Sequence, residues 1–186
     1  MKTKIISFVF LLTTFFLSAL STKIYAEEKA AGPSATFAHI MTQQREDHRV
    51  KSIKGYLEKN NSPLAPYADI FVAQADINSI PWDLLVAMSG TESTFGQQVP
   101  VNCNNAWGFG IYGDQTLCFN SYPEAIATIS KAIRSQYIDK WGAKDVFDIG
   151  KTYASSPMWG IHTDYFMHEV EDYQKELQMQ DLPISI

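Results

Sequence analysis

Apolar residues recur with helical spacing in several segments of the chain, and stretches rich in Asn, Gly, Pro and Ser separate these segments. The spacing predicts one or two amphipathic helices within residues 37–57, the second of them, from Val50, the better defined. Further helices are predicted at residues 64–74, 81–92, 122–133, 146–153 and 163–177. Most of the core is therefore expected to be helical.

Local residue choices mark the starts of two of these helices. Pro81 suits a first helical turn, where the carboxylate of Asp83 lies favourably at the positive end of the helix dipole. Ser121 and Glu124 have the spacing of a capping box, with Ser121 as the N-cap. The helix after it carries an apolar stripe made of Ala125, Ile126, Ile129, Ala132 and Ile133.

Between Phe95 and Phe119 the pattern changes to Gln, Pro, Asn and Gly with alternating aromatic residues. We interpret this segment as a loop followed by a short β-hairpin. The order of helices, a small β element and further helices predicts an α+β fold, mostly α, with the hairpin beside the helix that ends near Glu92.

The only two cysteines, Cys103 and Cys118, lie 15 positions apart and bracket a Gly- and aromatic-rich loop within this segment. In a chain that leaves the reducing compartment, a disulfide is the natural interpretation, and two free thiols are the alternative. Closing a loop of about 15 residues would stabilise the fold by roughly 3 kcal/mol.

The N-terminal residues have the outline of a secretory signal. Lys2 and Lys4 precede an uncharged apolar stretch, and Ala26 offers a cleavage point after a small residue. Ile24 departs from the small-residue rule, so an uncleaved anchor is the alternative. The predicted organisation is a signal peptide at 1–26, a flexible tether at 27–36, one domain at 37–178 and a tail at 179–186. We expect export to the periplasm, cell envelope or exterior.

Charge and motif spacing exclude several classes of partner. The chain has a formal charge of −5, and removal of 1–26, which holds three lysines and no acid, would leave about −8. Nucleic acid and anionic membrane are poor partners for such a surface, and we expect a monomer whose membrane contact is limited to an uncleaved N-terminal segment.

The sequence of residues 108–113 matches the Gly-x-Gly-x-x-Gly fingerprint of dinucleotide-binding proteins. An Asn-rich loop precedes these residues and no helix follows, however, so no nucleotide is expected. The histidines lack metal-ligand spacing, and neither a metal nor a cofactor is expected.

Glu92 is the candidate with the clearest chemistry. It falls in the last predicted turn of an apolar helix, between this helix and the aromatic segment that follows. An apolar site and a helix C-terminus both raise the pKa of a carboxyl group, as a general acid for glycoside hydrolysis requires. A solvated Glu at the end of a helix is the simpler alternative.

Four segments resemble known glycosidases. The run 80–96, with Glu92 followed by Ser, resembles the catalytic helix of the lysozyme superfamily. Segments 104–109, 119–126 and 152–159 are similar to the Asn-aromatic-Gly turn, the helix-opening segment and the Tyr-Ala loop of the bacterial glucosaminidase (autolysin) family. The resemblance implies a lysozyme-like domain, and an endo-β-N-acetylglucosaminidase that cleaves peptidoglycan glycan strands with Glu92 as its acid.

The resemblance leaves the second catalytic group open. Asp114 could activate water or serve as a turn residue, Glu124 is already explained by its capping role, and otherwise the N-acetyl group of the substrate could assist. Tyr153 could position an N-acetyl sugar or be a packed tyrosine. Sugar faces stack on flat rings, although core packing explains any single ring as well. The candidate substrate contacts are Asn105, Trp107, Phe109, Tyr112 and Trp159.

Two other functions stay open. A lytic transglycosylase would use the same fold and Glu92 but release an anhydro-sugar product. A wall-binding module would keep the fold without turnover. Retention of Glu92 argues against it, and the unidentified second carboxylate argues mildly for it.

Overall fold

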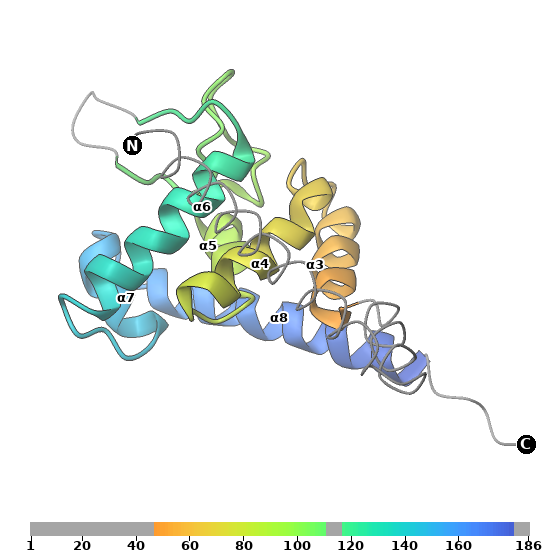
Figure 1. Ribbon diagram of the computed structural model, residues 1–186. Coiled ribbons are helices and arrows are strands. Elements are labelled where there is room, and N and C mark those ends of the chain that lie inside the picture. Colours follow the sequence, from red (N-terminus) through yellow and green to blue (C-terminus); the bar gives the residue numbers. More distant parts are fainter. Residues whose placement is uncertain (1–46, 111–116, 181–186) are drawn as a thin grey trace, which may run out of the picture. The chain divides into compact units, whose positions relative to one another are not determined.

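The computed structural model describes residues 47–110 and 117–180. The helices of this part are α3 (His48–Lys59), η1 (Ala65–Tyr67), α4 (Ala68–Asn78), α5 (Leu84–Ser93), α6 (Tyr122–Ala132), η2 (Ile133–Ile138), α7 (Val146–Tyr153) and α8 (Trp159–Gln180). Helix α8 packs against α3, α5 and α7, and α4 packs against α3 and α6 (Figure 1). None of these helices is both long and apolar enough to cross a membrane. The predicted signal and tether lie outside the described residues.

The helix starts at Asp47 and Ser121 have a clear chemical cause. The Asp47 carboxylate accepts a hydrogen bond from the backbone N–H of Arg49 at 2.9 Å. The Ser121 hydroxyl accepts one from the N–H of Glu124 at 3.3 Å, as the capping box predicts. The Glu124 carboxylate reaches one residue farther back than expected and accepts from the N–H of Asn120 at 3.0 Å. The predicted start of α6 is confirmed, and its apolar stripe is buried.

Several helices begin at other residues than expected. The predicted helix at 64–74 is observed as the 3-10 turn η1 followed by α4, which begins at Ala68 and extends to Asn78. Helix α8 begins at Trp159 and not at Thr163, because Ser156 forms a turn in which its carbonyl accepts from the N–H of Trp159 at 3.2 Å. Helix α5 begins at Leu84, and Pro81 belongs to the turn before it, where its carbonyl accepts from the N–H of Leu84 at 3.3 Å. Asp83 is the N-cap residue, but its side chain makes no capping hydrogen bond.

The predicted β-hairpin is wrong for the part of 95–119 that the structure describes, which contains no strand. The backbone turns repeatedly into the left-handed region at Asn102, Asn104, Gly108 and Gly110, which prevents an extended run. The two sides of the loop are joined by side-chain hydrogen bonds, from Asn104 to the carbonyl of Phe119 and from Asn105 to that of Leu117, and not by a ladder of backbone bonds. The described fold is therefore mostly α; residues 111–116 lie outside the described part.

The predicted disulfide between Cys103 and Cys118 is confirmed, with the two Cα atoms 4.4 Å apart. Beside it, the N–H of Phe119 donates to the carbonyl of Cys103 at 2.8 Å. The bridge thus closes the Gly- and aromatic-rich loop between the two cysteines, and neither cysteine belongs to a helix.

We expect a thiol reagent to label no cysteine in the native, non-reduced chain and both cysteines after reduction and unfolding. Reduction should leave the helix content nearly unchanged, because the bridge constrains the loop and leaves the helices intact. Intact-mass analysis and far-UV circular dichroism of the same samples measure both effects. Two labels on the native chain would contradict the assignment.

A π-helical turn, η2, continues α6 without a break. The N–H of Asp139 donates to the carbonyl of Arg134 at 2.9 Å, and the N–H of Trp141 to that of Gln136 at 3.0 Å, both five residues back. The wider turn buries Tyr137 and brings its ring to 4.9 Å from the ring of Trp141, edge to face.

Candidate active site

Glu92 lies in the last turn of α5, as the sequence predicts. The helix ends in a left-handed residue, Thr94, and the N–H of Phe95 returns to the carbonyl of Ser89 at 3.0 Å. The Phe95 ring then folds back over Gly90, where a Cβ would lie 2.6 Å from the ring. Only glycine fits there, and the closed helix end fixes the backbone that carries Glu92.

Ser93, beside Glu92, ties the helix to the aromatic segment. Its hydroxyl donates to the carbonyl of Ala106 at 2.7 Å and accepts from the N–H of Gly96 at 2.9 Å. Ser93 is buried, so both bonds are shielded from water. Ser93 therefore holds the loop against the helix, directly beside Glu92.

Asn105 organises the loop and does not point a free amide outward. Its side-chain amide donates to the carbonyls of Phe109 at 2.8 Å and Leu117 at 2.7 Å. Its side-chain oxygen accepts from the N–H of Trp107 at 3.3 Å and of Phe109 at 3.1 Å. These bonds replace the hairpin ladder and use the donors that a substrate would need.

Trp107 is a core residue, with an exposed fraction of 0%. Its indole N–H donates to the carbonyl of Leu85 at 2.8 Å, and its ring packs 6.1 Å from that of Phe71. It therefore has no open face for a sugar, and the structure assigns it to packing beneath the loop. Phe109 is half-buried, and Tyr112 and Asp114 lie outside the described residues.

Trp159 contacts the proposed acid directly. Its indole N–H donates to Oε1 of Glu92 at 2.6 Å, while its own side chain is buried, with 3% exposed. The ring stacks on that of Tyr153 with centroids 4.9 Å apart. Trp159 is therefore a buried partner of the Glu92 carboxylate, and not the exposed stacking ring that the sequence suggests.

Tyr153 stacks on the Trp159 ring and is itself held by two further contacts. Its hydroxyl donates to the carbonyl of Trp107 at 2.7 Å, and its ring lies 5.7 Å from that of Tyr137. Burial, and then the charge of Glu92, raise the pKa of Tyr153 well above its usual value. Tyr153 thus stays neutral and holds Trp159 in place. Tyr137 was not predicted; its only signal in the sequence is its position four residues after Ile133.

The pKa of the Glu92 carboxyl group is higher than that of an exposed glutamate. Burial raises its pKa above the usual value, and the hydrogen bond from Trp159 partly opposes that rise. No acidic side chain among the described residues contributes to the shift. Nor do these residues contain a cluster of His, Cys, Asp and Glu that could hold a metal ion.

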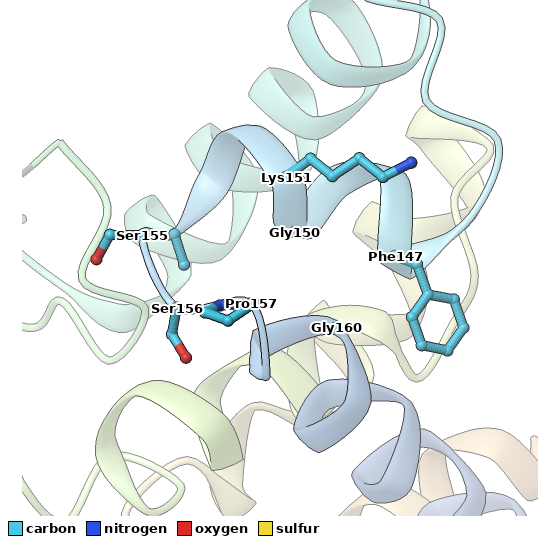
Figure 2. Close-up of a pocket in the computed structure, with 8 residues that line it drawn as sticks. Phe147, Gly150, Lys151, Ser155, Ser156, Pro157 and Gly160 are labelled. Atoms are coloured by element: carbon cyan, nitrogen blue, oxygen red, sulfur yellow. The ribbon is translucent and has the colours of Figure 1, made fainter.

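A cavity of about 450 Å³ lies away from Glu92, which is not among its lining residues. It lies between α7 and α8, with Phe147 at one end and Ser155 and Ser156 at the other (Figure 2). Gly150 and Gly160 let the helices approach closely there, since a Cβ on Gly160 would lie 3.0 Å from the Phe147 ring. The loop that closes this cavity leads directly into Trp159.

Trp159→Phe should raise the pKa of Glu92 further, because it removes the N–H that favours the charged carboxylate but keeps an aromatic ring over Tyr153. A reaction that needs the protonated acid is lost as pH rises through this pKa, so the alkaline limb of the pH profile of kcat/KM should move to higher pH. Trp82→Phe, the same change at a partly buried tryptophan in the turn before α5, serves as the control. An alkaline limb that stays in place in Trp159→Phe would contradict the role of the hydrogen bond.

In comparisons with known proteins, no family model and no curated protein matches this chain. The family resemblance stays a prediction that rests on the four motifs.

Proposed function

We propose that the protein is a glycosidase that cleaves the glycan strands of peptidoglycan, with Glu92 as its general acid. The observation that carries the proposal is the half-buried Glu92 carboxyl group, whose pKa is raised by burial and whose Oε1 is engaged by the Trp159 indole. A general acid must remain protonated near its working pH and still be able to lose its proton. Burial supports the first requirement, and the indole N–H supports the second.

The hydrogen bond also distinguishes the two carboxyl oxygens. Oε1 accepts from Trp159, so the proton of the neutral acid resides on Oε2. In the proposed reaction Oε2 gives this proton to the oxygen of the scissile glycosidic bond as the bond to the sugar carbon breaks. The indole N–H then stabilises the carboxylate that forms.

The substrate class rests on the resemblance of the four segments to bacterial glucosaminidases. An N-acetyl amino sugar polymer, with no cofactor, is the substrate that the resemblance implies. Export is part of the same proposal, because peptidoglycan lies outside the cytoplasmic membrane.

The lytic transglycosylase is the second candidate. It is favoured by one observation: no second carboxylate among the described residues acts on the pKa of Glu92. Attack by a group of the substrate itself needs no such partner, whereas a water-activating Asp114 would restore the hydrolase mechanism.

Mass spectrometry of the products from purified sacculi tests the proposal. A hydrolase of the glucosaminidase type should leave reducing N-acetylglucosamine ends, and a transglycosylase should leave anhydro-muramic ends. Intact sacculi after prolonged incubation with the folded chain would contradict both, and would favour a wall-binding module.

A further inference from the structure

Trp141 exposes about half of its side chain, 51%, at the end of η2. Its ring is nevertheless held in place, because it packs edge to face on Tyr137, whose own side chain is 9% exposed. A large ring that is both fixed and open to water loses little conformational entropy when a ligand covers it. This is a feature of binding sites more than of solvated surfaces.

A cavity of about 230 Å³ adjoins the Trp141 ring. Gly142, with φ of 76°, turns the chain here, and a Cβ on it would meet no atom within 4 Å, so the space at this wall of the cavity is open. The remaining walls of the cavity are Ala143, Asp148, Lys151 and Thr152.

The polar groups of this cavity include both donors and acceptors. The Asp148 carboxylate accepts from Nζ of Lys151 at 2.7 Å, in an exposed ion pair. The Thr152 hydroxyl donates to the carbonyl of Ile149 at 3.2 Å and so keeps its lone pairs for another donor. The pair of opposite charges gives the cavity no strong preference for an anion.

A fixed aromatic face with donors and acceptors at its edge complements a pyranose ring, which has an apolar C–H face and a rim of hydroxyl groups. We propose that Trp141 and this cavity form a second sugar-binding site, apart from Glu92, that takes one residue of an N-acetylhexosamine chain. The choice of this ligand rests on the proposed function. The Asp148 carboxylate at the cavity wall disfavours an anionic lipid surface in the same place.

A row of aromatic rings connects the two sites. Successive ring centroids lie 4.9 Å apart from Trp141 to Tyr137, 5.7 Å from Tyr137 to Tyr153 and 4.9 Å from Tyr153 to Trp159, which bonds Glu92. A polymeric strand is long enough to occupy both sites at once, whereas a single sugar is not. The second site therefore holds polymer near the acid and raises the effective concentration of scissile bonds.

The test follows the indole N–H resonance of Trp141, identified by its loss in Trp141→Phe, in the full chain carrying Glu92→Gln. Titration with tetra-N-acetylchitotetraose should shift this resonance, and Lys151→Met should weaken that titration several-fold. In pelleting with purified sacculi, Trp141→Ala should bind at least about tenfold more weakly, equivalent to 1.4 kcal/mol. Tyr165→Ala, a matched loss of an exposed ring on α8, should bind as the parent does.

An unmoved Trp141 resonance at millimolar saccharide would overturn the proposal. A resonance that responds to vesicles of phosphatidylglycerol and phosphatidylcholine but not to the saccharide would overturn it in favour of a lipid surface. The proposed role of Glu92 and the proposed sugar site at Trp141 can be refuted independently of each other. If Glu92→Gln keeps full activity while the Trp141 resonance still titrates, the role of Glu92 falls and the sugar site stands.

Discussion

Glu92→Gln is expected to lower the rate of glycan cleavage by about 100-fold to 10,000-fold, the usual effect of losing a general acid. Glutamine has the same shape and can still accept the hydrogen bond from Trp159, so the fold and the ring stack should persist. What it lacks is a proton that it can give away. The measurement is the initial rate of release of soluble fragments from purified sacculi, with circular dichroism to confirm the fold.

Glu124→Gln is the matched control for this experiment. Its carboxylate accepts hydrogen bonds from the backbone and side-chain amides of Asn120, and a glutamine oxygen can accept them as well. Its activity should stay within a few-fold of that of the parent. If both variants lose activity equally, or if Glu92→Gln retains it, the assignment of the acid to Glu92 is wrong.

Asp83→Asn is expected to increase the free energy of unfolding at pH 7 by up to about 3 kcal/mol. Asp83 is 2% exposed, and its Oδ2 has no hydrogen-bond partner in the described part of the chain. Burial raises its pKa from 3.8 to about 6. A hydrogen bond from its own backbone N–H and the charge of His168 oppose this rise, whereas the charge of Glu171 adds to it. An asparagine carries no charge and so avoids the cost of burying an ionised carboxylate.

The sign of the pH dependence follows from the raised pKa. Between pH 4 and 6 the folded chain holds a proton on Asp83 that the unfolded chain has released, so stability falls as pH rises through this range. Denaturant unfolding at several pH values should show this fall in the parent and a flatter profile in Asp83→Asn. Asp69→Asn, at an exposed acid in the first turn of α4, should change stability by less than about 1 kcal/mol and keep the parental profile. An identical profile in Asp83→Asn would contradict the prediction.

Local patterns in the sequence were sufficient where neighbouring residues determine the structure. The capping box at Ser121 predicted the start of α6, and the 146–153 pattern predicted the bounds of α7. The helix that carries Glu92 and the pair Cys103–Cys118 were also predicted. In each case the responsible contacts lie within one helix or across one short loop.

The remaining features depend on contacts between distant residues. Glu92 and Trp159 are 67 positions apart, and only the packing of α5 on α8 brings the indole to the carboxylate. The sequence does not distinguish an exposed tryptophan from a buried one, so it allows Trp107 to be a substrate contact, although its N–H is hydrogen-bonded inside the core. The hairpin failed because the side chain of Asn105 supplies bonds that the pattern assigns to a backbone ladder.

The π-helical turn η2 makes the spacing of its residues as important as their identity. Deletion of one residue within 134–136 would restore α-helical geometry and rotate every following side chain by about 100° around the helix. Tyr137 would then turn away from Tyr153, and Trp141 would leave its cavity, although every aromatic letter remained. Chains that share this aromatic row should therefore be recognised by the number of residues between the capping serine and the tyrosine. A relative that is one residue shorter in this stretch would retain the aromatic residues but lose the contacts between their rings.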